Sequence, residues 1–86
     1  MYKTTFRTSV KTENSLIEVD GYSTIKVTNT GDDVIIINDN IQIAANLMWH
    51  WKNDPDVVID VPVYIRFAGT GVSPKALIEQ YYFQKI

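Results

Sequence analysis

STIKVTNTGDDVIIINDNIQIAANLMWHW, residues 23–51, is the stretch that decides the fold. It contains three turn signals, the longest apolar run of the chain and both tryptophans. Apolar and polar residues alternate over 23–27, the NTGDD segment interrupts them, and four β-branched residues follow over 34–37. Because alternation with period two is typical of half-buried strands, we predict a meander of short strands on which the other segments pack. The 34–37 strand is either buried on both faces, or buried on one and covered by a partner on the other.

The flanking segments continue the strand pattern. Residues 2–10 alternate between an apolar-to-neutral face and a basic-polar face, and residues 61–67 alternate as well. Pro62 cannot donate a hydrogen bond, so we expect the 61–67 strand to start at a sheet edge or beside a bulge. Ser73-Pro74 is a good helix start, but Tyr81-Tyr82-Phe83 has high β propensity, and we predict a strand for the tail.

These elements amount to seven or eight short strands. Their spacing of about 8–12 residues is typical of a sandwich or barrel. We therefore predict an all-β chain with one domain, residues 1–86, folded as a small antiparallel β-sandwich of Ig-like or jelly-roll-like type. Residues 29–33 should form a hairpin loop with Gly31 in the left-handed conformation. Residues 38–40 should form a tight turn.

Composition limits the classes of function. The net charge is −2 and the eight basic residues are scattered, whereas a nucleic-acid binder clusters them. No apolar run approaches the roughly 20 residues of a membrane helix. The chain has no cysteine. Domains of this size usually add disulfides, a metal or a partner chain, so we expect assembly with other subunits.

No constellation for catalysis or metal binding stands in the sequence. His50 is the one histidine, no G-x-S-x-G elbow accompanies it, and we expect it on the outer face of a strand between the tryptophans. Carboxylates in loops could bind calcium, but their spacing matches no EF-hand and turn aspartates are common for backbone reasons. GTGVSPK, residues 69–75, lacks phosphate-loop spacing and should be a turn. We therefore expect no catalytic residue, metal or cofactor, and no enzyme. The loop carboxylates are Asp32, Asp33, Asp39, Asp54, Asp56 and Asp60.

The aromatic residues allow two interpretations. Trp49 and Trp51, together with several tyrosines, could form a platform on which sugars stack. Their i, i+2 spacing places both on one face of a strand, where they could equally fill a small core or anchor a protein interface. We favour core or interface over sugar binding. The tyrosines concerned are Tyr22, Tyr64, Tyr81 and Tyr82.

The segment VTNTGDDVIIINDNIQIAANLMWHW, continued by DVPVYIRFAGTG and ALIEQYYF, carries a family resemblance. Its order is apolar strand, N-T-G-D, apolar strand, I-N, I-x-I, small-residue turn, aromatic strand, D, and a strand ending in F-x-G. This layout resembles small β-sandwich decoration and fibre-base modules of tailed phages, notably the crAss-like phages of gut Bacteroides. The resemblance spans roughly residues 22–83. The chain has Ala44-Ala45-Asn46 where Pro-Gly is expected.

The resemblance implies a structural role in a virion assembled in the bacterial cytoplasm. The protein would act as a head-decoration or auxiliary protein that binds the major capsid protein or neighbouring structural subunits, in many copies or as a homo-oligomer. It would not bind nucleic acid directly or a membrane. The alternatives are a carbohydrate-binding module using Trp49 and Trp51, and a small regulator of a host protein. We expect interface contacts from Tyr2, Phe6, Arg7, Trp49, Trp51, Tyr64 and Arg66.

Overall fold

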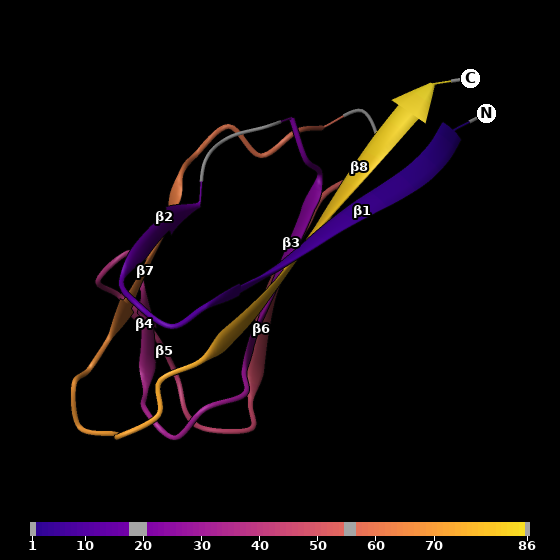
Figure 1. Cartoon of the computed structure of the whole chain (residues 1–86). Coiled ribbons are helices and arrows are strands. Elements are labelled where there is room, and N and C mark those ends of the chain that lie inside the picture. Colours follow the sequence, from indigo (N-terminus) through magenta and orange to yellow (C-terminus); the bar gives the residue numbers. More distant parts are fainter. Residues whose placement is uncertain (1, 18–20, 55–56, 86) are drawn as a thin grey trace.

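The chain folds into two layers of antiparallel strands (Figure 1). The computed structural model describes residues 2–17, 21–54 and 57–85, and over these it contains eight strands and no helix. The all-β prediction and the predicted number of strands are confirmed. The strands are β1 (Tyr2–Lys11), β2 (Ser15–Ile17), β3 (Thr24–Asn29), β4 (Ile35–Ile37), β5 (Ile41–Ile43), β6 (Met48–Lys52), β7 (Val63–Phe67) and β8 (Ala76–Lys85).

The strand order is that of a jelly roll. One four-stranded sheet, here sheet A, has the order β1-β8-β3-β6, and the other, sheet B, has the order β2-β7-β4-β5. Strand β1 pairs with β8, β2 with β7, β3 with β6 and β4 with β5. The chain thus resembles one long hairpin whose successive strand pairs lie alternately in sheet A and sheet B. This nested pairing defines the double-sheet jelly roll and selects it from the two predicted sandwich types.

The core lies between the sheets and is built mainly from β-branched residues. Alternation along each strand sends every second side chain inward. In β4, Ile35 and Ile37 are fully buried while Ile36 is half-buried on the outer face. Strand β4 therefore buries one face fully and not both, which excludes the first of the two predicted alternatives. The buried apolar residues are Ile17, Tyr22, Ile25, Val27, Ile35, Ile37, Ile43, Ile59, Val63, Ile65, Ala76 and Ile78.

The predicted meander is wrong. Strands β3 and β6 pair in sheet A, while β4 and β5 pair in sheet B, so residues 29–33 cross between sheets and form no hairpin. Gly31 is not left-handed, since Gly21 and Gly69 are the glycines with positive φ in the described part of the chain. Alternation fixes which side chains face inward, but it does not fix which strand lies beside which.

Two other local expectations had different outcomes. The turn at 38–40 is confirmed: Asn38 and Asp39 have φ of 50° and 58°, as in a type I′ turn, and the Asn40 amide donates to Ile37. Of the two settings predicted for Pro62, an edge or a bulge, the sheet edge is wrong, because β7 lies between β2 and β4. Pro62 precedes the first residue of β7, so its missing N–H interrupts no ladder bond.

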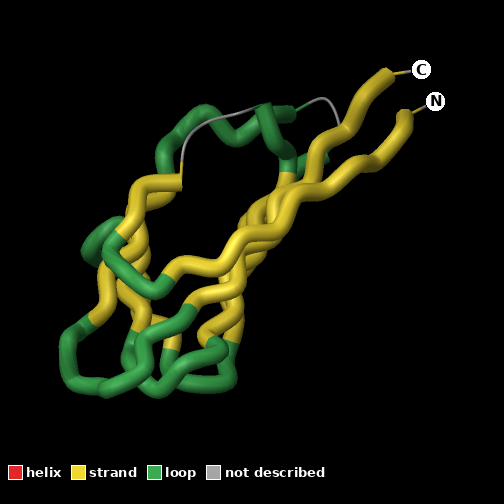
Figure 2. The backbone as a smooth tube through the Cα atoms, in the orientation of Figure 1, coloured by secondary structure: helices red, strands yellow, loops and turns green. Residues whose placement is uncertain are grey.

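The two terminal strands continue beyond the sandwich as a ribbon (Figures 1 and 2). Pairing of β3 with β8 ends at Tyr81, whereas β8 continues to Lys85 against the start of β1. Residues 2–5 and 82–85 therefore pair with each other alone. The ribbon contributes to the 45 Å long axis of the molecule and brings both chain ends to one tip.

Burial along β4 predicts unequal effects of two neighbouring substitutions. Ile37→Ala should lower the free energy of unfolding by about 2–5 kcal/mol, because it removes a fully buried side chain and leaves a cavity. Ile36→Ala should cost less than half as much, because its side chain is half-buried. Urea unfolding of both variants measures the difference. Equal losses would contradict the placement of Ile36 on the outer face.

Candidate functional site

Two adjacent aspartates join the loop that leaves β3 to the loop that leaves β7. The Asp32 carboxylate accepts from the amides of Val72 (3.1 Å) and Ser73 (2.8 Å). The Asp33 carboxylate accepts from the Gly69 amide (2.9 Å) and from the amide (3.3 Å) and hydroxyl (3.1 Å) of Thr70. We call this set of contacts the aspartate clamp. It holds together two chain segments that both cross from one sheet to the other.

Glycine allows the two loops of the clamp to approach. A Cβ on Gly31 would collide with the Ser73 carbonyl and the Lys75 amide, and a Cβ on Gly71 would collide with Asp32. The close approach lets the Gly31 amide donate to the Lys75 carbonyl (3.1 Å) and the Asp32 amide to the Ser73 carbonyl (3.2 Å). Gly31 therefore serves packing between loops and not a left-handed turn.

Asn29 connects the clamp to the core. Its side chain is fully buried at the end of β3. The Nδ2 group donates to the carbonyls of Asp33 (2.6 Å) and Ile43 (2.9 Å), and Oδ1 accepts from the Gly31 amide (3.1 Å). Because buried polar groups are costly unless they are bonded, this one side chain fixes the crossover loop against both β3 and β5.

Asp33 is held as a carboxylate. Burial raises the pKa of Asp33, but hydrogen bonds from the Gly69 amide, the Thr70 hydroxyl and amide, and the Val34 amide outweigh burial and leave the pKa below its ordinary value. The ionised form is thus an anchor for loop amides, which accounts for this aspartate without a metal. Among the described residues no group of three or more His, Cys, Asp or Glu side chains could hold an ion. Asp56 lies outside the described residues.

The predicted interface residues do not form one site. Phe6 lies on the outer face of sheet A, 64% exposed, with its ring centroid 5.7 Å from that of Tyr81. Arg7 is exposed but turns the other way: its guanidinium lies 5.6 Å from the Tyr82 ring centroid and donates to Gln80 Oε1 (3.4 Å). Tyr2 begins β1, and its side chain lies outside the described part.

The tryptophans face the core. Trp49 pairs with Val27 and Trp51 with Ile25, so both lie on the inner side of sheet A, partly buried against the core. His50 points outward between them and is exposed, as predicted. The tryptophans therefore pack partly into the core and do not form the exposed platform that the sugar alternative requires at these positions.

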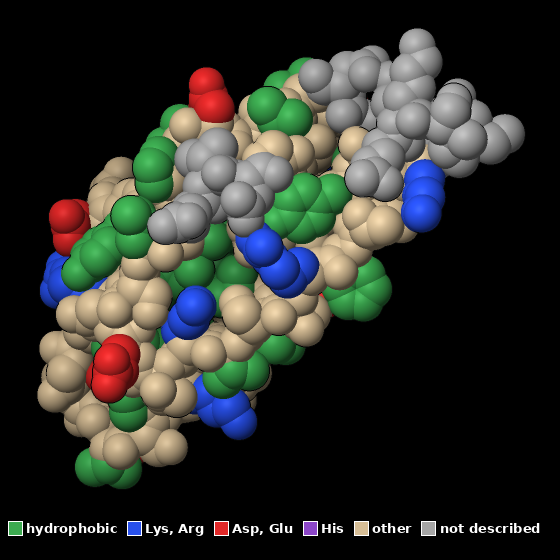
Figure 3. Space-filling model, turned by 45° about the horizontal axis from the view of Figure 1, so that its top comes forward, with side chains coloured by type: hydrophobic (Ala, Val, Ile, Leu, Met, Phe, Trp, Pro, Cys, Tyr) green, Lys and Arg blue, Asp and Glu red, His purple; other side chains and the backbone are tan. Residues whose placement is uncertain are grey.

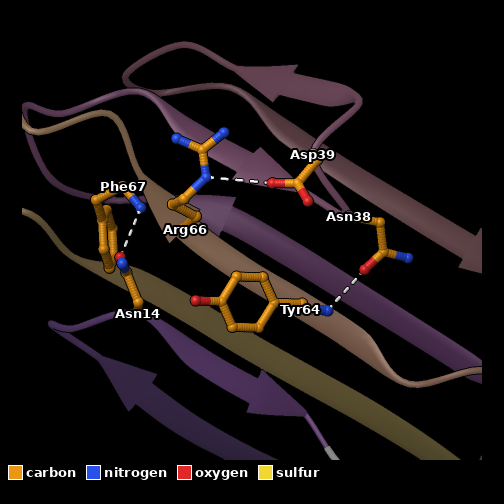
Figure 4. A network of polar contacts seen from close by, with 6 residues as sticks. All are labelled: Asn14, Asn38, Asp39, Tyr64, Arg66 and Phe67. Carbon is orange, nitrogen blue, oxygen red and sulfur yellow. Dashed lines mark hydrogen bonds and ion pairs between the residues drawn. The ribbon is translucent and has the colours of Figure 1, made fainter.

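Tyr64 and Arg66 lie on the outer face of sheet B within a polar network (Figure 4). Arg66 Nε donates to the Asp39 carboxylate (3.3 Å), and the Tyr64 amide donates to Asn38 Oδ1 (2.7 Å). The Phe67 amide likewise donates to Asn14 Oδ1 (3.0 Å). These side chains thus attach the β1–β2 loop and the β4–β5 turn to strand β7.

The outer face of sheet A carries side chains from all four of its strands. Strand register aligns its side chains in rows that run across the four strands. The apolar row is Val10, Leu77, Thr28 and Met48; the charged row is Thr8, Glu79, Lys26 and His50; and the aromatic row is Phe6, Tyr81, Thr24 and Lys52. The sequence shows each of these residues, but only the strand register shows which of them lie side by side.

Two details give this face its shape. Lys26 Nζ lies 3.9 Å from Glu79 Oε1 in the middle of the charged row. A shallow hollow of about 280 Å³ lies beside the aromatic row and is lined by Thr24, Lys52, Tyr81 and Phe83. Figure 3 shows that apolar side chains reach the surface of the molecule in patches among Lys and Arg.

No helix in the described residues is long and apolar enough to cross a membrane.

The low pKa of Asp33 predicts acid-dependent stability. At neutral pH, Asp33→Asn should lower Tm by roughly 5 °C or more, because an amide cannot accept from all of these donors. The contribution of the ionised group is complete above the unfolded pKa near 3.9 and is lost as pH falls through it towards the lower folded value. The gap in Tm between wild type and variant should therefore shrink from pH 7 to pH 3 in thermal unfolding. Asp60→Asn, at an exposed position, is the control, and a gap that does not change with pH would contradict the assignment.

Close approach at Gly31 predicts a second effect. Gly31→Ala should lower the free energy of unfolding by about 1–3 kcal/mol, because the added methyl group overpacks against backbone atoms that cannot rotate away. Thr30→Ala changes the exposed neighbouring side chain and should have little effect. Denaturant titration compares the two variants, and equal stability would show that the loops separate without cost.

Comparison with known proteins gives no assignment: no family model, curated protein or solved structure matches this chain. A functional proposal therefore depends on the fold and surface described above.

Proposed function

We propose that the chain is a non-enzymatic structural protein of a phage virion, a head-decoration or auxiliary protein that binds the capsid lattice and neighbouring copies. The observation that carries the proposal is the edge of β1. This strand is ten residues long, and no described strand lies beyond it in sheet A. In an antiparallel strand, alternate N–H and C=O groups point away from the one neighbour. A neighbouring subunit can add a strand to such an edge.

The side chains of β1 favour selective pairing over aggregation. Inward-pointing charges and lysines protect edge strands from indiscriminate association. Lys3, Arg7 and Lys11 lie in register with Gln84, Gln80 and Ala76, on the side opposite Phe6. A partner strand would have to accommodate these charges, so the edge suits a defined neighbour in an assembly.

Fold-level analogy points in the same direction. Jelly rolls are common in viral capsid proteins and in lectins, although a fold alone does not specify function. Trp49 and Trp51 face inward and are partly buried, so they offer little surface to a sugar, which supports the virion role over the sugar alternative. The ribbon formed by residues 2–5 and 82–85 (Figure 1) offers a further projection that a neighbouring subunit could bind.

The abundance of the chain in particles tests the proposal. Quantitative mass spectrometry of purified virions of the encoding phage should detect it at a copy number near that of the major capsid protein. A few copies per particle would place it at the neck or tail instead of the head. Absence from particles, with capture of a bacterial protein in pull-downs, would overturn the proposal in favour of the host-regulator alternative.

Neighbouring proline substitutions test the edge itself. Backbone N–H groups of Thr8 and Ser9 point to opposite sides of β1, because successive residues alternate. At the position whose N–H points toward β8, proline removes a bond to β8 and should destabilise the fold by about 3 kcal/mol or more. At the position whose N–H points away from β8, proline should leave the fold intact and prevent strand addition. The folded variant should be lost from particles; its incorporation at wild-type copy number would show that another surface attaches the protein.

A further inference from the structure

The outer face of sheet A has the properties of an interface between like copies. Phe6, Val10 and Met48 are 64%, 52% and 55% exposed, which is a large share of the surface for apolar side chains of this size. They lie at the two edges of the face, on β1 and β6, while a lysine and a glutamate occupy its centre. A partner that covers this face would have to place opposite charges against the lysine and the glutamate at its centre.

We propose that this face binds the same face of a second copy, so that two sheets A pack against each other in a symmetric dimer. The inference is independent of the virion role, since it uses the outer face and not the β1 edge. It rests on the charge pattern, the placement of Phe6 relative to the hollow, and the size of the surface.

Charge selects the symmetry axis. Consider a two-fold axis that lies in the interface, parallel to the strands and midway between β8 and β3. Rotation about it places β8 of one copy over β3 of the other, and each row of side chains faces the same row of the second copy. Glu79 then faces Lys26 of the second copy, and Lys26 faces its Glu79, so both charges are paired twice. A two-fold axis along the rows would instead place Glu79 against Glu79 and Lys26 against Lys26. Packed sheets cross at about 30°, which shifts residues far from the centre of the interface out of alignment. The charged pair lies nearest the centre, so its alignment changes least.

The same axis brings apolar groups into contact. It exchanges β1 with β6, which places Val10 opposite Met48 in the apolar row. In the aromatic row it places Phe6 opposite Lys52, one of the residues that line the hollow of about 280 Å³. A protruding aromatic ring against a partner's hollow is the usual form of an interface anchor. Two such anchors form by symmetry.

The size of the face agrees with a weak, reversible dimer. Four strands about 4.8 Å apart, and the five residues about 3.4 Å apart that the three rows span, give a flat footprint of roughly 20 by 17 Å. Side-chain relief increases the surface buried on each partner to roughly 400–600 Å², just below the standard range for specific interfaces. We therefore expect a monomer–dimer equilibrium that depends on concentration.

Charge reversal with mixing tests the geometry. Each single variant, Glu79→Lys or Lys26→Glu, loses the ion pair within its own chain and places like charges across the interface, so its dimer Kd should rise at least roughly tenfold. An equimolar mixture of the two variants should dimerise again. In the mixed dimer the introduced lysine of one chain faces the introduced glutamate of the other, and the unchanged Lys26 of the first faces the unchanged Glu79 of the second. The mixture restores no pair within a chain, so folding alone cannot explain the recovery. Sedimentation velocity over a concentration series measures each Kd.

A matched pair of apolar substitutions locates the interface. Met48 and Leu16 are each 55% exposed, on the outer faces of sheets A and B respectively. Met48→Ser should raise the dimer Kd by roughly tenfold, and Leu16→Ser should leave it unchanged. A wild-type protein that stays monomeric up to about 1 mM, a mixture of charge variants that does not recover, or equal effects at Met48 and Leu16 would each overturn the proposal. None of these outcomes bears on whether the chain is present in virions.

Discussion

The structure depends on the aspartate clamp, because a jelly roll in so short a chain needs its crossovers held. Every strand pair of the nested order lies in the opposite sheet from the previous one, so each connection except the β4–β5 turn must leave one layer and enter the other. Two of these connections meet where Asp32 and Asp33 accept five hydrogen bonds from residues 69–73. Two carboxylates thereby orient the two loops through directional hydrogen bonds. Disulfides cannot serve this purpose, since the chain has no cysteine.

The second constraint is that one small core cannot cover every apolar side chain. The layer between the sheets accommodates the isoleucines, the valines and the inner faces of Trp49 and Trp51. The apolar side chains that alternate outward on β1, β6 and β8 are left at the surface. The outer face of sheet B uses its polar residues differently, to fix loops to β7 through Asn14, Asn38 and Asp39. Both outer faces expose apolar side chains, Met48 on sheet A and Leu16 on sheet B, but the described loop contacts cover part of sheet B.

Sequence periodicity predicts local structure well here because burial enforces it. The strands over residues 2–11 and 24–29 follow from period-two alternation. The strand over 76–85 follows from the β propensity of Tyr81-Tyr82-Phe83, and the turn at 38–40 follows from the tolerance of Asn and Asp for positive φ. Strand order does not follow, because residues 34–37 would be equally apolar beside β3 or beside β7. The role of Gly31 was unpredictable for the same reason: the atoms that exclude a Cβ belong to Ser73 and Lys75, distant in sequence. Residue type alone groups Phe6 with Tyr64 as interface candidates, although the two lie on opposite outer faces.

The β1 edge and the outer face of sheet A can act together because they use different directions of the same sheet. The proposed strand addition at β1 would extend sheet A sideways through backbone groups, whereas the proposed pairing of two outer faces would stack sheet A on a second copy through side chains. Phe6 belongs to both, since it lies on the edge strand but points out of the face. A neighbouring strand beside β1 would leave the ring exposed to the second copy and would also shield its flank from water. Shielding of this kind strengthens central contacts in protein interfaces, so occupation of the edge should favour pairing of the faces.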